Sequence, residues 1–480
     1  EVEQMNLFKD MVCYQEEVRD PSRMAEVLNR VIEKAFRGSA PAQINVPRDY
    51  WTQVIDIELP PIVRFERQGG GKDAIERAAK LLSDAKFPVI LSGAGVVIGD
   101  AIEDCKKIAE KLDAPVCSGY QHNDSFPGSH PLAVGPLGYN GSKAAMQLIS
   151  KADVILALGT RLNPFSTLPG YGIDYWPKEA SIIQVDMNPD RIGLTKKVTV
   201  GICGDAKMVS QQLLAKLSER AGNNGREDRK NLIHQTKSAW LQTLSGLDHE
   251  DDDPGTVWNK EARERDKDRM SPRQAWRAIQ TAMPDDVIIS SDIGNNCAIG
   301  NAYPTFEKGR KYLAPGLFGP CGYGFPSILG AKIGCPKTPV IGFAGDGAFG
   351  ISMNEMSSCA RKEWPAITMV IFRNYQWGAE KRNSILWFDD NFIGTELDPE
   401  LSYAKVANAC GLKGVTVKTM EETTKAIKQS CDDQKKGITT FIEVILNQEL
   451  GEPFRRDAMK KPVKVAGINK EDMKPQKSLI

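Results

Sequence analysis

The stretch Val340-Ile-Gly-Phe-Ala-Gly-Asp-Gly-Ala-Phe-Gly350 decides the fold class of this chain. Its first five residues form an apolar run that predicts a buried β-strand, and residues 366–372 predict a second one, which ends just before Asn374. Residues 352–361 between them predict a helix. A strand, helix and strand in this order make a right-handed crossover with parallel strands. Asp346 and Asn374 are therefore expected at the same edge of one sheet.

Asp346 and Asn374 carry the oxygen atoms that Mg²⁺ prefers. Mg²⁺ takes about six hard oxygen ligands, commonly one or two from side chains and the rest from water and phosphate groups. Gly345 and Gly347 let the backbone approach a ligand, and the amides at the start of the next helix favour an anion. Gly-Asp-Gly alone is most simply a turn that needs glycine, but its spacing to Asn374 favours a site for Mg²⁺ and a diphosphate.

The same spacing resembles the metal and diphosphate motif of thiamine diphosphate-dependent enzymes, in the branch that contains acetolactate synthase. Ser291-Asp-Ile-Gly-Asn-Asn296 resembles the upstream diphosphate loop of that family, and Gly316-Leu-Phe-Gly-Pro-Cys-Gly-Tyr-Gly-Phe-Pro326 resembles its cofactor-clasping segment. The resemblance runs from about Tyr14 to Pro453. Within the branch, the second segment and Phe372-Arg-Asn-Tyr-Gln-Trp-Gly-Ala-Glu-Lys-Arg382 are most similar to the sulfoacetaldehyde acetyltransferases.

The resemblance implies a multi-domain α/β fold of doubly wound parallel sheets that binds thiamine diphosphate. The expected parts are a C-terminal remnant of a pyrimidine-binding domain with a linker (1–60), a central Rossmann-like domain (61–218), a charged linker (219–270), a thiamine diphosphate and Mg²⁺ domain (271–450) and a polar, lysine-rich tail (451–480). Since most of the pyrimidine-binding domain is absent, the glutamate that activates the cofactor in the family has no counterpart in this sequence.

Local patterns support these parts. Helical spacing is expected over residues 22–36 and 73–82, a strand over 42–49, and further strands over 89–91, 154–158 and 181–185. Residues 219–270 are highly charged and predict a helical linker with an exposed loop, with 223–230 and 249–254 as the least foldable pieces.

The resemblance also implies site residues. Those expected to bind the cofactor are Gly294, Asn295, Asn296, Gly319, Cys321, Gly345, Asp346, Gly347, Ala348 and Asn374. Asp346, Asn374 and the backbone carbonyl of Gln376 are expected to bind Mg²⁺. Cys321 stands where the family has a large apolar residue that supports the bent cofactor, so we expect it to pack there rather than to act as a nucleophile. Asp292 repels phosphate and is expected to cap a turn.

Glu380 and Asn383 are the catalytic candidates of this chain, because the family places the matching helix beside the reacting carbon. Glu380 is either a buried acid or base with a raised pKa or a surface carboxylate that pairs with a neighbouring cation. Lys381, Arg382 and Arg161 are candidates for contacts with anionic substrates, although each taken alone is most simply a surface charge.

The implied reaction converts sulfoacetaldehyde and phosphate into acetyl phosphate and sulfite, as in the degradation of taurine and other sulfonates. One alternative is acetolactate synthase-like carboligation or decarboxylation of a 2-oxo acid. Another is a non-catalytic paralogue that binds a diphosphate or serves in assembly. In the family the cofactor lies between two subunits, so a homodimer or homotetramer is expected.

Composition limits the remaining possibilities. The chain has 62 basic and 62 acidic residues, which suggests neither a nucleic-acid nor a membrane-surface partner. No apolar run approaches the ~18 residues of a membrane span, and scattered cysteines without a Cys-x-x-Cys pair favour a reducing, cytoplasmic compartment. The four histidines are expected to be surface or packing residues. Gly93-x-Gly95 is compatible with FAD, but a tight strand-to-helix turn is the preferred interpretation.

Overall fold

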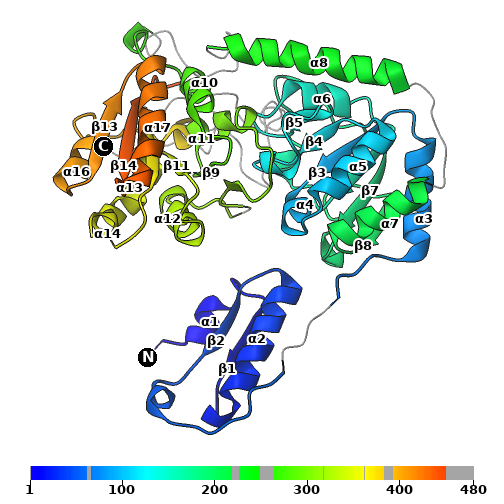
Figure 1. The fold of residues 1–480 in the computed structure, drawn as a ribbon, viewed down its shortest axis with the longest axis horizontal. Coiled ribbons are helices and arrows are strands. Elements are labelled where there is room, and N and C mark those ends of the chain that lie inside the picture. Colours follow the sequence, from blue (N-terminus) through cyan, green and yellow to red (C-terminus); the bar gives the residue numbers. More distant parts are fainter. Residues whose placement is uncertain are drawn as a thin grey trace, which may run out of the picture. The chain divides into compact units, whose positions relative to one another are not determined.

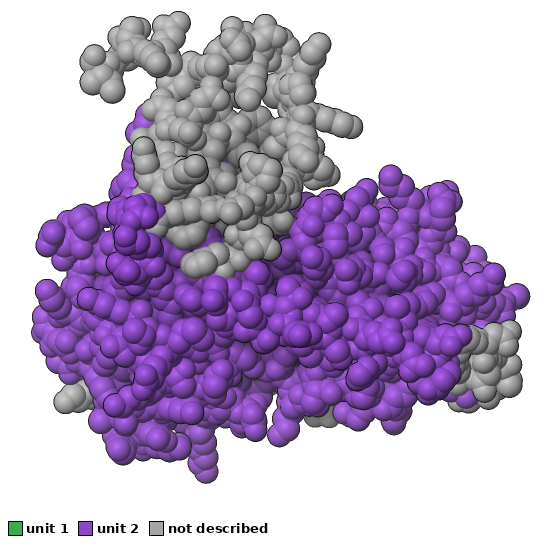
Figure 2. Space-filling view, turned by 90° about the horizontal axis from the view of Figure 1, so that it is seen from above, with its two compact units in different colours: residues 1–67 green, residues 68–480 purple. Residues whose placement is uncertain are grey.

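The structure is a computed structural model that describes residues 2–61, 66–218, 226–248, 264–316, 318–361, 363–382 and 393–449. The chain divides into two units, Glu1–Arg67 and Gln68–Ile480. Figure 1 labels the elements of both, and Figure 2 shows a face of the second unit.

The first unit is a small α/β layer. Its elements are α1 (Gln4–Phe8), β1 (Tyr14–Glu17), η1 (Pro21–Arg23), α2 (Met24–Gly38), β2 (Ala42–Asn45) and η2 (Arg48–Thr52). β1 and β2 pair in parallel, and α2 covers them through Val27 and Val31. The predicted helix and strand are confirmed, although the strand ends at Asn45, before Pro47. A neighbouring side of α2 exposes the apolar side chains of Leu28, Ile32 and Phe36, the last of which is 78% exposed.

The second unit contains two parallel sheets among its described residues. The first has the order β5-β4-β3-β6-β7-β8. Its strands are β3 (Pro88–Ser92), β4 (Val116–Ser118), β5 (Ala133–Pro136), β6 (Val154–Leu158), β7 (Ser181–Asp186) and β8 (Val200–Cys203). β3 and β6 are buried at every position, as expected for parallel strands that are covered on both faces. The strands predicted at 89–91, 154–158 and 181–185 are thus confirmed.

Helices and short turns connect these strands. They are α3 (Lys72–Asp84), α4 (Ala94–Ile98), α5 (Ile102–Leu112), η3 (Asn123–Ser125), α6 (Lys143–Ile149), η4 (Pro164–Ser166), η5 (Pro189–Arg191), α7 (Ala206–Ser218) and α8 (Arg226–Gly246). α3 confirms the predicted helix at 73–82. α8 packs against α6, and its Ile233 joins the core of the first sheet while Trp240 joins that of the second (Figure 1).

The second sheet has the order β10-β9-β11-β12-β14-β13, again with parallel pairs throughout. Its strands are β9 (Ile288–Ser291), β10 (Tyr312–Leu313), β11 (Val340–Gly345), β12 (Thr368–Arg373), β13 (Lys413–Val417) and β14 (Thr440–Ile445). Its helices and turns are α10 (Pro272–Ala282), α11 (Asn295–Ile299), η6 (Gly300–Ala302), α12 (Gly324–Gly334), α13 (Asp346–Ser352), η7 (Met353–Glu355), α14 (Met356–Ala360), α16 (Tyr403–Ala409) and α17 (Met420–Lys435).

Alternate residues of the central strands enter two different cores. Ile341 and Phe343 of β11 pack with Trp276 of α10, whereas Val340 and Ala344 pack with Phe325 of α12. This two-residue period places helices on both faces of the sheet, which is the doubly wound α/β arrangement. The predicted fold class is confirmed, including the predicted parallel pairing of β11 with β12.

Two local predictions need correction. The helix after β11 was expected at 352–361, but α13 already begins at Asp346 and a separate α14 covers Met356–Ala360. The start at Asp346 follows from the direct turn of the buried strand into a helix, which outweighs the poor helix propensity of the glycines. Residues 223–230 were expected to be poorly foldable, but α8 begins at Arg226, where Arg229 is buried. Residues 249–254 and the tail 451–480 lie outside the described residues.

Candidate active site

Asp346 and Asn374 follow the carboxyl ends of two adjacent parallel strands. β11 and β12 pair with Gly345 opposite Phe372, so the next residues of both strands emerge at one edge of the sheet. Both side chains are buried, and both line the same cavity of about 190 Å³. The geometry therefore brings one carboxylate and one amide to a common space, as the crossover argument predicted.

The cavity also gathers the other expected cofactor residues. The residues that were predicted from the sequence and that line the cavity are Gly294, Asn295, Asn296, Gly319, Cys321, Gly345, Asp346, Gly347, Ala348, Asn374, Gln376 and Glu380. Ile293, Trp377, Gly378 and Ala379 complete its lining. Asn383 lies outside the described residues. Four segments that are far apart in the sequence thus meet at one place.

The carboxylate of Asp346 is tightly held. One oxygen accepts from the Arg373 guanidinium at 3.0 Å and from the backbone N–H of Tyr375 at 2.7 Å, and the other accepts from the N–H of Gly347 at 3.0 Å. The Tyr403 hydroxyl donates to the Asp346 carbonyl at 2.9 Å. Burial raises the pKa of Asp346 to about 6, and the positive charge of Arg373 opposes that rise.

The first turn of α11 carries polar atoms that have no partner among the described residues. Both side-chain polar atoms of Asn295 and the amide oxygen of Asn296 are buried without a hydrogen-bond partner. Gly294 has φ 125° and ψ 171°, a conformation that favours glycine, and an added Cβ there would meet nothing within 4 Å. Buried polar groups are normally satisfied. The Asn295 Nδ2 donor fits a ligand oxygen, such as one of a diphosphate, whereas the two amide oxygens fit a donor of the ligand.

The Asp292 side chain connects the loop before α11 to the glycine-rich segment before α12 through hydrogen bonds to backbone N–H groups. Its carboxylate accepts from the backbone N–H groups of Ile293 at 2.8 Å, Gly322 at 3.1 Å and Gly324 at 2.7 Å. Burial raises its pKa, and these hydrogen bonds act in the opposite direction. The predicted capping role of Asp292 is confirmed, and it links the loop before α11 to the loop before α12.

The clasping segment presents Gly319 and Cys321 to the cavity. Gly319 has φ 63°, in the left-handed region, where glycine is favoured. Cys321 has an exposed side chain, and partial burial raises the pKa of its thiol. At Gly347, an added Cβ would lie 2.8 Å from the Trp377 ring. Only glycine therefore leaves room for the indole at this position.

The candidate substrate contacts have different surroundings. Arg382 is only 1% exposed, and it donates to the Tyr139 hydroxyl and lies over the Tyr139 ring, so its interpretation as a surface charge is wrong. Lys381 forms an ion pair with Glu396. Arg161 is half-buried and is not among the residues that line the cavity; burial, followed by the nearby Arg191, lowers its pKa. Glu380 lines the cavity with an exposed side chain.

Sequence reasoning missed the residues that hold the loop of Asn374 and Gln376 beside the cavity. No role was predicted for Arg373, although a charged residue at the end of an otherwise apolar strand often indicates a buried partner of opposite charge. Tyr403 and Gln448 carry no local signal, because each reaches the site from a distant part of the chain. Gln448 donates to the Asn374 carbonyl at 3.1 Å.

The glycine pair of the central sheet has a packing reason. An added Cβ at Gly93 would lie 2.6 Å from the Gly159 carbonyl oxygen, and one at Gly95 would lie 2.7 Å from the Gly159 Cα. The turns after β3 and β6 therefore pass each other at backbone contact distance. This confirms the interpretation of Gly93-x-Gly95 as a tight strand-to-helix turn.

Two segments match known protein families. Residues 75–213 match "Thiamine pyrophosphate enzyme, central domain", and residues 292–444 match "Thiamine pyrophosphate enzyme, C-terminal TPP binding domain". Thiamine pyrophosphate is another name for thiamine diphosphate. The second match begins at Asp292 and contains all four segments that line the cavity.

Curated relatives extend the similarity to the whole chain. The "Probable sulfoacetaldehyde acetyltransferase" of Rhizobium meliloti is 76% identical, over 100% of this chain and 81% of the relative. The "Sulfoacetaldehyde acetyltransferase" of Castellaniella defragrans is 46% identical, over 97% and 78%. The "Probable acetolactate synthase large subunit" of Methanocaldococcus jannaschii is 28% identical, over 90% and 71%. The family matches, these relatives and the cavity agree: the chain belongs to the thiamine pyrophosphate enzyme family.

Proposed function

We propose that this protein is a thiamine diphosphate- and Mg²⁺-dependent acetyltransferase that converts sulfoacetaldehyde and phosphate into acetyl phosphate and sulfite. Three relatives that carry the name of this activity are 67–76% identical over nearly the whole chain. The acetolactate synthase relative is far less similar, at 28% identity. The difference in identity favours the acetyltransferase over a 2-oxo acid carboligase.

The observation that carries the proposal is the convergence of Asp346, Asn374 and the unsatisfied Asn295 and Asn296 on one cavity. In the proposed site, Asp346, Asn374 and the carbonyl of Gln376 hold Mg²⁺. Among the described residues no group of three or more His, Cys, Asp or Glu side chains offers another metal site. The metal then balances the charge of the buried Asp346 carboxylate together with Arg373.

The glycine-rich loops hold the rest of the cofactor in this proposal. Gly294 to Asn296 offer donors to the diphosphate, as does the amide of Ala348, while Gly347 lets the backbone approach it, and the Gly319 carbonyl accepts from the aminopyrimidine ring. Bound thiamine diphosphate supplies a nucleophilic carbon and an electron sink. Cys321 and Trp377 form the wall beside it, where the chain limits its conformation and excludes water.

The proposal includes a second subunit at the site. The cavity of about 190 Å³ is smaller than the ~300–1,000 Å³ of typical ligand pockets, so the described residues enclose only part of a cofactor of this size. A homodimer or homotetramer, in which another subunit's pyrimidine-binding domain closes the site, supplies the remainder. The exposed apolar side of α2 fits the proposal that residues 1–60 end a larger domain of this kind.

Two cations on the helical turn at 378–382 are proposed to attract the anionic substrates. Lys381 and Arg382 directly follow Glu380, which lines the cavity. Arginine favours planar, bidentate contacts with oxyanions, and lysine acts as a point charge. Replacing each by alanine and measuring the KM values for phosphate and for the aldehyde separately tests the assignment. A residue whose loss leaves both values unchanged has no such role.

The remaining proposals concern the cellular compartment of the protein and whether its central domain binds FAD. None of the described helices combines the length and the apolar character that crossing a membrane requires. The ten cysteines are free in this structure, which supports a reducing, cytoplasmic compartment. The packing role of Gly93 and Gly95 supports a central domain that works without FAD.

The decisive experiment uses the full-length oligomeric protein with thiamine diphosphate, Mg²⁺ and phosphate. Sulfite and acetyl phosphate released from sulfoacetaldehyde would support the proposal. Carbon dioxide released from pyruvate, without sulfite release, would favour the carboligase. Coenzyme binding without either product would favour a non-catalytic paralogue. Asp346→Asn should abolish Mg²⁺-dependent coenzyme uptake in calorimetry, whereas Asp190→Asn, in an exposed turn, should not.

A further inference from the structure

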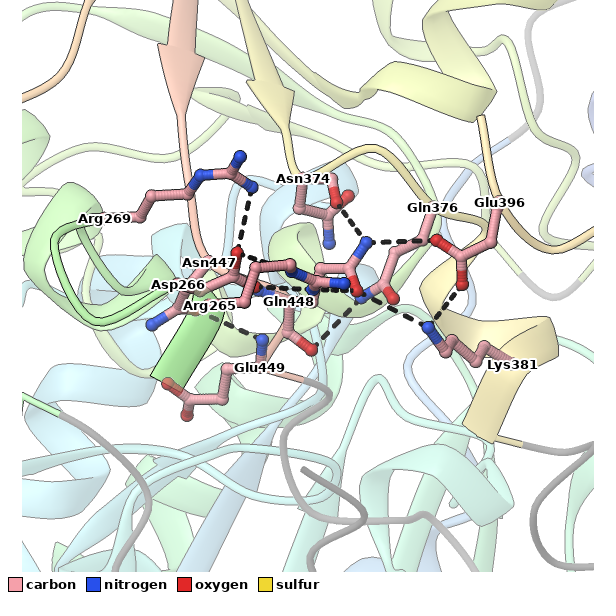
Figure 3. Close-up of polar contacts among 10 residues, drawn as sticks. All are labelled: Arg265, Asp266, Arg269, Asn374, Gln376, Lys381, Glu396, Asn447, Gln448 and Glu449. Atoms are coloured by element: carbon pink, nitrogen blue, oxygen red, sulfur yellow. Dashed lines mark hydrogen bonds and ion pairs between the residues drawn. The ribbon is translucent and has the colours of Figure 1, made fainter. Parts of the chain in front are cut away.

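Gln448 lies beside the proposed metal-binding loop although it is distant in sequence. The ladder between β12 and β14 continues one residue past β14, since the Leu446 N–H donates at 3.0 Å to the carbonyl of Arg373, the last residue of β12. Two residues after Leu446, Gln448 is 5% exposed and faces the loop from Asn374 to Gln376 (Figure 3). Its position therefore follows from the sheet register itself.

Two hydrogen bonds that run in opposite directions tie Gln448 to this loop. The Gln448 Nε2 donates to the Asn374 carbonyl at 3.1 Å, and the Gln376 Nε2 donates to the Gln448 carbonyl at 3.2 Å. The two residues that flank Tyr375 are thus held by one residue (Figure 3). Because Asn374 and Gln376 are the proposed Mg²⁺ ligands, this pair of bonds fixes the segment that presents them.

Gln448 is in turn held from outside the loop. Its Oε1 accepts from Arg265 and, at 3.5 Å, from Lys381, and its Nε2 also donates to Glu396 at 3.1 Å. Its backbone N–H donates to Asp266 at 3.1 Å. The Asp266 side chain is fully buried and pairs with Arg265 and Arg269 at 2.8 and 3.1 Å. Every polar group of Gln448 is therefore engaged, which leaves its side chain a single arrangement.

We propose that Gln448 is a positioning residue for the Mg²⁺ site: it holds the loop of Asn374 and Gln376 in the arrangement that an octahedral metal requires. The inference rests on the proposed Mg²⁺ and diphosphate site. Mg²⁺ demands near-ideal geometry at short distances, whereas Ca²⁺ accepts six to eight ligands in flexible geometry. Loosening the loop should therefore weaken Mg²⁺ binding more than Ca²⁺ binding. Residues that orient metal ligands typically change metal affinity 10- to 100-fold when they are replaced.

The test replaces Gln448 by methionine, which keeps the length of the side chain and removes its side-chain hydrogen bonds, including the one to the Asn374 carbonyl, while the backbone bonds with Gln376 and Asp266 remain. The chain offers a matched control in Gln434 of α17, which is 7% exposed. It donates to the Val340 carbonyl at 2.7 Å and to the Thr368 hydroxyl at 2.8 Å, at the amino ends of β11 and β12. Gln434→Met thus removes a buried amide at the amino ends of β11 and β12, whereas Gln448 lies beside the segment that follows the carboxyl end of β12.

The measurement is calorimetric binding of thiamine diphosphate to the full-length oligomer in the presence of Mg²⁺ or of Ca²⁺, with thermal unfolding of the metal-free protein alongside. We expect Gln448→Met to weaken Mg²⁺-dependent binding 10- to 100-fold and to raise the ratio of the Mg²⁺ to the Ca²⁺ dissociation constant. Gln434→Met should lower the unfolding temperature but leave that ratio unchanged. Gln448→Glu keeps the acceptor for Arg265 and Lys381 and removes the donor to Asn374, so it tests the same bond if the methionine variant does not fold.

Each outcome has a distinct meaning. Wild-type protein that takes up no coenzyme with Mg²⁺ contradicts the proposed function itself. Wild-type protein that binds, together with a Gln448 variant whose metal ratio equals that of wild type, overturns the positioning role. Equal weakening by the Gln448 and Gln434 variants also overturns it, because loss of stability alone would then explain the effect.

Discussion

Replacing Arg373 by methionine tests how much free energy of unfolding the metal-free protein loses when the buried Asp346 carboxylate has no cation beside it. The Arg373 guanidinium and the Asp346 carboxylate are 3.0 Å apart, and both side chains are 1% exposed. Methionine fills much of the same volume but carries no charge, so the buried carboxylate loses its cation. Arg373 also donates to the carbonyl groups of Asp398 and Leu401, and these two bonds are lost as well.

The expected magnitude follows from the burial of the pair. Removing one partner of a buried ion pair costs about 3–5 kcal/mol, because the other charge remains without compensation. Burial already raises the pKa of Asp346 to about 6 with Arg373 present, and loss of that positive charge raises the pKa further. In the proposed complex with Mg²⁺ and coenzyme, a divalent cation would replace the missing positive charge. The loss should then be clearly smaller than in the metal-free protein.

Urea unfolding of four proteins measures this coupling. They are wild type, Arg373→Met, Asp346→Asn and the double variant, each in the absence of metal. The double-mutant cycle removes the contribution of the bonds to Asp398 and Leu401, because Arg373 makes them in both backgrounds. We expect Arg373→Met to cost about 3–5 kcal/mol when Asp346 is present and clearly less in the Asp346→Asn background. Equal losses in both backgrounds would refute the argument that the ion pair balances the buried charge.

Three further predictions address the loops and the central domain. Gly294→Ala should weaken coenzyme binding and cost about 1–3 kcal/mol in urea unfolding, because φ 125° is strained for alanine while its Cβ meets no neighbour; an unchanged unfolding midpoint would contradict this. His122 has its pKa lowered to about 4, first by burial and then by Arg161. The unfolded chain therefore binds the proton more readily, and His122 lowers stability as pH falls from about 6.5 to 4, by up to about 3 kcal/mol. Unfolding at pH 6.5 and 4.5 should show a smaller pH difference for His122→Asn than for wild type. Arg229→Met should cost on the order of 3 kcal/mol and expose α8 to limited proteolysis, because the guanidinium donates to the carbonyl groups of Lys86, Leu112 and Asp113; undiminished protease resistance would count against this anchoring role.

Local periodicity and motif chemistry were sufficient for the fold class and for most of the cavity wall. Buried parallel strands read as short apolar runs, so β3, β6, β7 and β11 were predicted close to their observed bounds. The crossover rule then placed Asp346 and Asn374 at one edge without any coordinates. The start of α13 was mispredicted because propensity disfavours helix at Asp-Gly-Ala-Phe-Gly, and the packing of the strand end overrides it.

The sequence by itself determined the chemistry of the site, since strand order and the positions of glycine, Asp346 and Asn374 depend on local rules. Only the tertiary structure decided which groups hold that chemistry in place. It buried Arg382 against Tyr139, paired Arg373 with Asp346, and set Gln448 beside Asn374. These contacts join residues that are distant along the chain, and their energies depend on burial. The burial of these polar groups is decided by contacts between distant segments, and the residues next to each of them in the sequence do not indicate it.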